Sequence, residues 1–410
     1  MRFFFLLILL GSLCGVNGAV RAQDAANEKP KSVFQQLFPH PTGNNGYEDL
    51  ILAGDLIRGN AALNGAMQFN TSLGLKRKAL EDPDVKRALT LVHTAFVKPF
   101  VSPRDPAKMT FASLFPDFAE LRNLARLFSI VEYVALADGK TGEALDAMDD
   151  CLRMARLIPA DSIISALVFV AVDVIAVNNI AVHKAQLSYR NSERLEALCE
   201  KWLRDTDSFA SAFAAERNML QNQFKAQPMD AENLLQMTMS DTSEENGNVE
   251  KSPEEKALEK RLTAHPEDAK KLLQQALENI NKSYDRLIDA AKKDAWERKP
   301  IMEPESDMAV KAIIDAMTPT FTMILTKQDQ DRANLHLLGT FAALERYRWI
   351  HRRYPATLKE LRSPLLTLDP LTGVFLVYKR EGNGYDLHSA GALGEDGKTR
   401  TPVYLPYRRN

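Results

Sequence analysis

The side chains that could do chemistry in this 410-residue chain are scattered along it rather than grouped in motifs. None of the 7 histidines has the H-x-H or H-E-x-x-H spacing that would place two imidazoles on one helix face to hold zinc. The chain also lacks a G-x-S-x-G elbow, an S-x-x-K pair, a glycine-rich phosphate loop and a G-x-G-x-x-G motif. This pattern favours a non-catalytic protein. An extracytoplasmic hydrolase without a sequence signature is the alternative.

One group of carboxylates has a spacing that could hold a cation. Asp146 and Asp150 stand one helical turn apart in a predicted helix and therefore share a face, with Glu143 and Asp149 beside them. The same pattern is typical of an exposed acidic helix face, and we favour that interpretation.

The first 22 residues have the pattern of a secretory signal peptide. A single positive charge at Arg2 precedes an apolar run from Phe3 to Leu13, and small residues lead to a cleavage point after Ala22. The run is shorter than the ~20 residues that span a bilayer as a helix. An uncleaved anchor is one alternative, and a lipoprotein acylated at Cys14 is another. We therefore predict an extracytoplasmic protein, either periplasmic or secreted.

Only Cys151 and Cys199 would remain after cleavage, in a compartment where thiols can oxidise. Both fall in predicted helices, so the sequence does not say whether their side chains face one another. Two buried free thiols are the favoured interpretation, and a disulfide is the alternative. Because the chain has no C-x-x-C and no Cys/His cluster, a structural zinc site is disfavoured.

The composition is that of an ordinary globular protein, with 45% hydrophobic and 26% charged residues. The charges nearly cancel, since 52 Lys and Arg stand against 54 Asp and Glu. No overall positive field would gather nucleic acid, so nucleic acid is excluded as an expected partner.

Most of the chain has apolar residues at helical spacing, which predicts a mainly α fold: an array or bundle of antiparallel helical hairpins with a small C-terminal α+β module. The clearest hairpin has apolar faces before and after the turn at Asp138 and Gly139. Its portion ADGKTGEALDAMDDCLRMA resembles a single tetratricopeptide-type helical unit, which implies a surface for binding proteins.

Residues 162–182 form the most apolar internal stretch, interrupted by Asp173, Asn178 and Asn179. Polar groups are costly in lipid, so we expect a helix buried in the protein, with a partner for the Asp173 carboxylate. A membrane-embedded envelope component is the alternative.

The composition changes sharply at residues 239–257, which are polar, acidic and nearly without large apolar residues. The predicted divisions are a signal peptide at 1–22, a helical domain at 23–238, a disordered acidic linker or insert at 239–257, a helical segment packing on the body at 258–333, and the C-terminal module at 334–410.

The C-terminal module has a pattern of its own. Helical spacing is predicted to end at Tyr354, because the residue before a proline disfavours the helical conformation. ATLKEL predicts a short helical turn, and LDPLTG a tight turn in which Asp369 caps and Gly373 takes a positive φ. VFLVYKR and YDLHS then predict an antiparallel hairpin around EGNG.

The ordered set LERYRWIHRRYPATLKEL, LDPLTGVFLVYKREGNGYDLHSAG and GEDG resembles the soluble C-terminal region of type II secretion major pseudopilins and related type IV pilin-like proteins. The resemblance covers about residues 334–397 and does not include the N-terminal assembly helix of that family. It implies calcium at the Asp-Gly loop, with Asp396 as ligand and Glu395 beside it; a surface turn is the alternative. Together these features predict a protein-binding or structural protein of the cell envelope, with an unknown protein as its partner.

Overall fold

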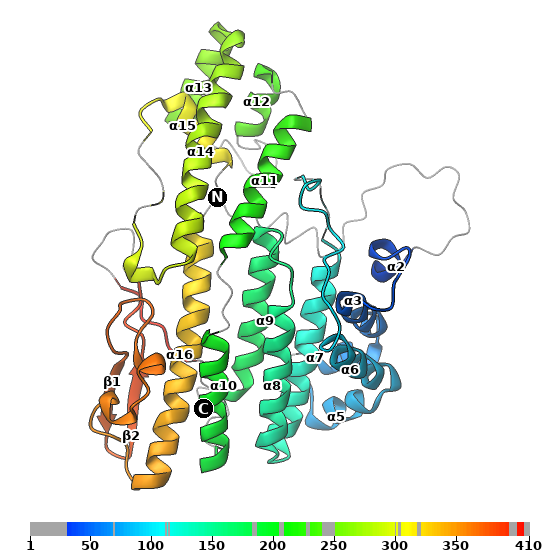
Figure 1. The fold of residues 1–410 in the computed structure, drawn as a ribbon, viewed down its shortest axis with the longest axis vertical. Helices are drawn as coiled ribbons and strands as arrows, with labels where there is room; N and C mark the ends of the chain where they lie inside the picture. Colours follow the sequence, from blue (N-terminus) through cyan, green and yellow to red (C-terminus); the bar gives the residue numbers. More distant parts are fainter. Residues whose placement is uncertain are drawn as a thin grey trace. The chain divides into compact units, whose positions relative to one another are not determined.

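The structure is a computed structural model (Figure 1). It describes residues 31–68, 70–110, 113, 115–182, 187–204, 209–226, 230–239, 251–299, 301, 305–317, 321–392 and 400–405. The predicted signal peptide and the predicted calcium ligands Glu395 and Asp396 lie outside these residues.

The prediction of a mainly helical fold is confirmed, since 69% of the structure is helix and a small two-stranded antiparallel sheet stands near the C-terminus. The chain divides into two compact units. The first comprises Met1–Pro103 with Leu114–Asp138, and the second comprises Arg104–Ser113 with Gly139–Asn410.

The first unit is a group of helices around a core of large apolar side chains such as Tyr47, Leu50 and Phe118. The Tyr47 hydroxyl donates to the buried carboxylate of Asp117 at 2.5 Å and joins the first turn of one helix to that of another. Its helices are α2 (Val33–Leu37), α3 (Gly46–Ile57), α4 (Ala61–Ala66), α5 (Leu73–Glu81), α6 (Pro83–Ala95) and α7 (Asp117–Ala137).

The second unit contains the remaining helices and the sheet. Its α-helices are α8 (Thr141–Arg156), α9 (Ile163–Val182), α10 (Tyr189–Arg204), α11 (Ala210–Ala226), α12 (Ala231–Thr238), α13 (Pro253–Ala264), α14 (Ala269–Ala291), α15 (Met308–Met317), α16 (Phe321–His351) and α17 (Pro364–Thr367). The 3-10 helices are η3 (Pro266–Asp268), η4 (Ala295–Glu297) and η5 (Leu358–Leu361), and the strands are β1 (Val377–Glu381) and β2 (Gly384–His388).

Helix α13 begins inside the segment predicted as a linker. Ser252 caps it with a capping box in which the Glu255 side chain accepts from the backbone of Ser252, and Pro253 occupies the first helical position. Residues 253–257 are therefore helical. The acidic composition that suggested disorder belongs here to the first turn of a helix, where negative charge is favourable.

Helix α16 is the central element of the second unit and packs against α9, α10, α17 and the sheet (Figure 1). Several of its buried or half-buried polar side chains have a partner outside the helix. Asp329 accepts from Arg298 at 2.5 and 2.8 Å, and Arg346 donates to Glu196 of α10 at 2.6 Å. Thr340 donates to the Leu366 carbonyl of α17 at 2.7 Å. These contacts fix which element lies against which side of α16.

Helix α9 is the one described helix that is long and apolar enough to cross a membrane, and 61% of its most apolar window is buried inside the protein. It packs against α8, α11 and α16. Its Asp173 is fully buried and accepts from Arg156 of α8 at 2.5 Å. The carboxylate thus has the partner that a buried position requires.

Candidate interaction surface

The sheet of the C-terminal module is a hairpin in which Val377 pairs with His388 and Glu381 with Gly384, around the two-residue turn Gly382–Asn383. Gly382 has φ 55°, as the first central residue of a tight hairpin turn requires. Two further contacts widen the sheet: Leu368 bridges Phe375, and Ser389 exchanges two backbone hydrogen bonds with Val403.

Asp369 holds the base of this hairpin together. Its carboxylate is 1% exposed and accepts from the Ser389 hydroxyl at 2.9 Å and from the backbone N–H groups of Leu371 and Ala390 at 2.9 and 3.0 Å. Gly391 follows with φ 82°, and a Cβ there would lie 1.9 Å from the Thr401 carbonyl oxygen. The D-P-x-x-G and S-x-G pieces noted in the sequence therefore act as one structural clasp.

One face of the sheet packs toward the C-terminal end of α16. Leu376 is 3% exposed, and Tyr385 lies between Tyr354 at 4.7 Å and Tyr378 at 5.9 Å, measured between ring centroids. The Tyr354 hydroxyl donates to Glu345 of α16 at 2.7 Å. These rings anchor the hairpin to the helix.

The opposite face of the sheet carries apolar side chains that are exposed. Phe375 and Val377 alternate with the buried Leu376, so they point outward, with 40% and 38% of their surface exposed. Leu368 faces Phe375 across a bridge and is 40% exposed. His388 faces Val377, and its ring lies 4.7 Å from that of Tyr404, which is 52% exposed. We call Leu368, Phe375, Val377, His388 and Tyr404 the outward face.

Trp296 of η4 extends the exposed apolar surface beside this sheet. It is 55% exposed, and its indole lies against Gly373, where a Cβ would come within 2.8 Å of the ring. Gly373 has φ 72° and is followed by Val374, which is 62% exposed. An antiparallel sheet with one packed face normally has polar residues on the other, so this exposed group needs an explanation.

Cations without an ionic partner surround the outward face, whereas the acids on that face, Glu381 and Asp386, pair with Lys379 and His388. Exposed cationic side chains between residues 352 and 380 that form no salt bridge to a described carboxylate are Arg352, Arg353, Lys359, Arg362 and Arg380. The Lys359 ammonium lies 5.9 Å above the Phe375 ring. The nearby Glu360 carboxylate is occupied by the Tyr347 hydroxyl and by the backbone N–H groups of Ala356 and Thr357.

The acidic face of α8 that could have held a cation is occupied by α10 instead. Asp146 pairs with Arg194, and Asp149 accepts from Lys201 at 3.0 Å and from the Trp202 indole at 2.7 Å. Within the described part of the chain, no group of three or more His, Cys, Asp or Glu side chains could hold a metal ion. Arg194 and Lys201 of α10 therefore supply positive charges to these acids.

Cys151 and Cys199 are both buried and free. The Cys151 sulfur lies 4.0 Å from the Val172 carbonyl of α9, and Cys199 packs against Gly339 of α16. Burial raises the pKa of the Cys199 thiol well above its ordinary value. The two cysteines are thus inert packing residues rather than a disulfide.

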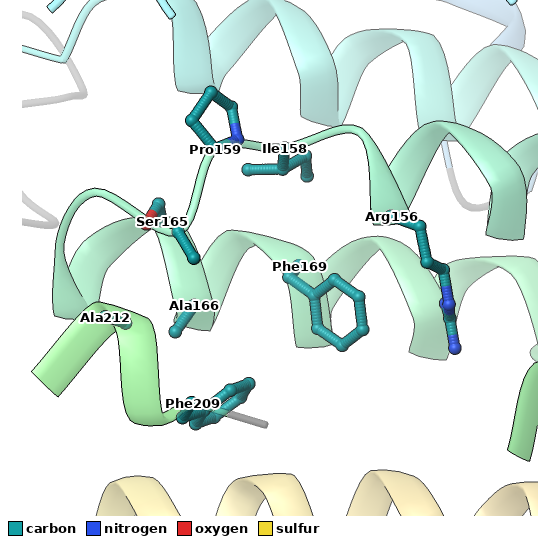
Figure 2. Close-up of a pocket in the computed structure, with 9 residues that line it drawn as sticks. Arg156, Ile158, Pro159, Ser165, Ala166, Phe169, Phe209 and Ala212 are labelled. Carbon is teal, nitrogen blue, oxygen red and sulfur yellow. The ribbon is translucent and has the colours of Figure 1, made fainter. Parts of the chain in front are cut away.

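A small, partly enclosed cavity lies between α9, α11 and the turn after α8 (Figure 2). Its volume is about 20 Å³, the size of one water molecule, and apolar groups such as Ile158, Phe169 and Phe209 line it. An open depression of about 660 Å³ lies beside Arg190 and Arg194. No histidine lines either space.

Two buried carboxyls with perturbed pKa values meet in the interior, Asp173 of α9 and Asp331 of α16. Burial raises the pKa of both carboxyls; Arg156 opposes the rise at Asp173, whereas the neighbouring Asp173 raises the pKa of Asp331 further. Simultaneous ionisation of both carboxyls is therefore disfavoured, and Arg156 supplies the positive charge beside them. The two carboxyls are 0% and 3% exposed, so they serve packing rather than a substrate.

Two other groups with shifted pKa values have structural roles. Burial lowers the pKa of His336 to about 4, and this neutral ring lies 3.3 Å from the Leu366 carbonyl, which joins α16 to α17. Burial raises the pKa of Glu216 to about 7, although its carboxylate accepts from the Ile163 N–H at 3.2 Å at the start of α9.

The outward face was not found in the sequence, although a signal was present. In VFLVYKR successive side chains point to opposite faces of the predicted strand, and large apolar side chains occur on both faces. A strand that is apolar on both faces is expected to be covered on both of them. Here one face is exposed.

Comparison with models of protein families, with curated proteins and with solved structures gives no match for this chain. Its function must therefore be inferred from the geometry of the molecule.

Proposed function

We propose that this chain is a non-catalytic protein-binding protein of the cell envelope, periplasmic or secreted, and that its C-terminal module binds the partner. The observation that carries the proposal is the outward face, in which Leu368, Phe375, Val377 and Tyr404 are 38% to 52% exposed on a rigid sheet. Exposed apolar groups gathered on one face, with polar residues around them, are typical of protein interaction sites.

The module is also well suited to hold such a face in one shape. The Asp369 clasp fixes the base of the hairpin, and the tyrosine cluster anchors its inner face to α16. A preorganised surface loses little conformational entropy when a partner binds. The resemblance of residues 334–397 to pseudopilin soluble regions supports a place beside secretion or pilus-like systems.

The binding proposal is tested by affinity capture from the envelope fraction with the tagged full-length chain and with a Phe375→Ser, Val377→Ser variant. We expect the variant to lose roughly tenfold or more of the partner, because central aromatic anchors dominate interface energies. The matched control is Val97→Ser, Val101→Ser, which removes side chains that are 82% and 59% exposed in the first unit. Equal recovery by all three proteins, with thermal unfolding unchanged, would remove the outward face from the proposal.

The proposed location has its own test. Sequencing the N-terminus of protein recovered from the periplasm or medium should give Gln23 as the first residue, because the predicted cleavage follows Ala22. An intact Met1 on protein that stays with the membrane after a high-pH carbonate wash would favour an anchored protein instead.

A further inference from the structure

The outer edge of β1 has backbone groups with no backbone partner in the described chain. The backbone N–H and C=O groups of even-numbered residues point to this edge. There the Val374 carbonyl accepts a hydrogen bond from the Asp369 N–H, and the Leu376 N–H donates to the Thr367 carbonyl. Odd-numbered residues such as Val377 and Glu381 face β2 instead, as the register around the two-residue turn requires.

Tyr378 and Arg380 come next on the outer edge. Among the described residues, neither their N–H groups nor their carbonyls have a backbone hydrogen bond beyond the hairpin. Tyr378 and Arg380 contact the chain at Pro355 and Tyr354 only through their side chains, at 2.8 and 3.4 Å. This edge is therefore a free template for another strand.

Cationic side chains lie near the outer edge of β1 and favour an acidic partner. Arg380 lies on the edge itself, and Lys359 lies over Phe375 on the outward face. Arg352 and Arg353 precede Tyr354, whose carbonyl Arg380 contacts. These cations have no salt bridge to a described carboxylate, whereas the whole chain has a net charge of only −2. The basic charge is thus local, and a complementary partner would be negative.

We infer that the partner binds as an acidic extended segment that adds a strand to the outer edge of β1 and lays alternate apolar side chains on the outward face. This inference rests on the proposed function and specifies the chemistry of the partner. The N–H and C=O groups of Tyr378 and Arg380 supply the main-chain hydrogen bonds. Phe375 and Val377 supply the apolar contact, and the free cations attract the acidic side chains.

The first test uses a short synthetic peptide of alternating glutamate and valine with the full-length chain. Hydrogen exchange at the amides of Tyr378 and Arg380 should be fast in the free protein and slow by roughly tenfold or more when the peptide is bound. Two control peptides carry lysine in place of glutamate, or N-methyl groups on alternate amides, and neither should bind.

Three results of that test would overturn the inference. One is protection of both amides already in the free chain, which would show that another part of this protein covers the edge. The second is equal binding of the N-methylated or the lysine peptide. The third is binding to vesicles of phosphatidylglycerol without binding to the glutamate–valine peptide, which would identify the basic surface as a lipid site.

The second test compares Arg380→Pro with Arg380→Gln. Proline removes the N–H on the free edge but leaves the β1–β2 hydrogen bonds intact, because those involve Val377, Lys379 and Glu381. We expect Arg380→Pro to abolish peptide binding and Arg380→Gln to weaken it by a few-fold. If captured partner is lost with Phe375→Ser, Val377→Ser but kept with Arg380→Pro, strand addition is wrong and the proposed function stands. If both variants keep the partner, both proposals fail.

Discussion

The interior of the second unit and its C-terminal module are both rich in charge, but the arginines around α16 face carboxylates, whereas several cations of the module do not. Around α16, Arg298, Arg156 and Arg346 each face a carboxylate at 2.5 to 2.6 Å. Around β1, Lys359, Arg362 and Arg380 have no salt bridge to a described carboxylate, and Phe375 beside them is 40% exposed. The first region has its counter-charges within this chain, whereas the second is the region that we propose binds an external partner.

The largest effect should come from breaking the interior cluster. Arg156→Met leaves the Asp173–Asp331 pair without its cation, and we expect a loss of about 3 to 5 kcal/mol of unfolding free energy, measured by urea denaturation. The matched control replaces Arg156 by Met and both Asp173 and Asp331 by Leu. It should leave the free energy of unfolding nearly unchanged, since apolar side chains of similar volume need no counter-charge. A loss of less than about 1 kcal/mol for Arg156→Met would contradict the assigned role of this cluster.

The next effect tests whether the module is as rigid as the interior. Asp369→Ala leaves the Ser389 hydroxyl and two backbone N–H groups without their acceptor, and we expect a cost of about 3 kcal/mol. Amide exchange should rise across β1 and β2 before global unfolding. Asp386→Ala is the control in the same sheet, because this side chain is 42% exposed and should change stability by less than about 0.5 kcal/mol.

Glu216 gives the interior a pH dependence. Its pKa is about 7 in the folded chain against an ordinary 4.5, so between these values only the unfolded chain ionises and stability falls as the pH rises. Glu216→Gln should remove roughly 3 kcal/mol of that decline in the free energy of unfolding, since a pKa unit corresponds to about 1.4 kcal/mol. The check is the free energy of unfolding at acid and mildly alkaline pH. An identical slope in the variant would place the titration elsewhere.

Gly373→Ala tests the contact that places Trp296 beside the outward face. The substitution strains a residue with φ 72° and brings a Cβ to within 2.8 Å of the indole. We expect a cost of about 1 to 2 kcal/mol and a shift in the emission of Trp296. Gly382→Ala is the control, because Gly382 has φ 55° and no heavy atom lies within 4 Å of its Cβ position. It shows the cost of backbone strain alone, without a contact to the indole.

The smallest effect is expected for the ion pairs between α8 and α10. Arg194 and Asp146 are 37% and 64% exposed, so Arg194→Ala should cost less than about 0.5 kcal/mol in thermal unfolding. A cost near that of Arg156→Met would remove the distinction between interior and surface pairs on which the comparison depends.

The local patterns of the sequence predicted much of the fold. Gly139 with φ 73° follows α7 at the predicted turn, and the hairpin around Gly382 has the predicted order of turn and strands. The pseudopilin-like and tetratricopeptide-like resemblances stay hypotheses. The helix ending was placed slightly late, since α16 ends at His351 and Arg352 takes φ 58° before the predicted stop at Tyr354.

By itself, the sequence determined the features that depend on a few neighbouring residues: the caps, the turns, the helical periodicity and the need of Asp173 for a partner. Only the tertiary structure decided which residues meet across long separations. It paired Asp173 with Arg156 and Asp331, covered the acids of α8 with Arg194 and Lys201, and left Phe375 and Val377 facing outward. Periodicity says which residues share a face, but the elements packed against that face decide whether it is buried, neutralised or open.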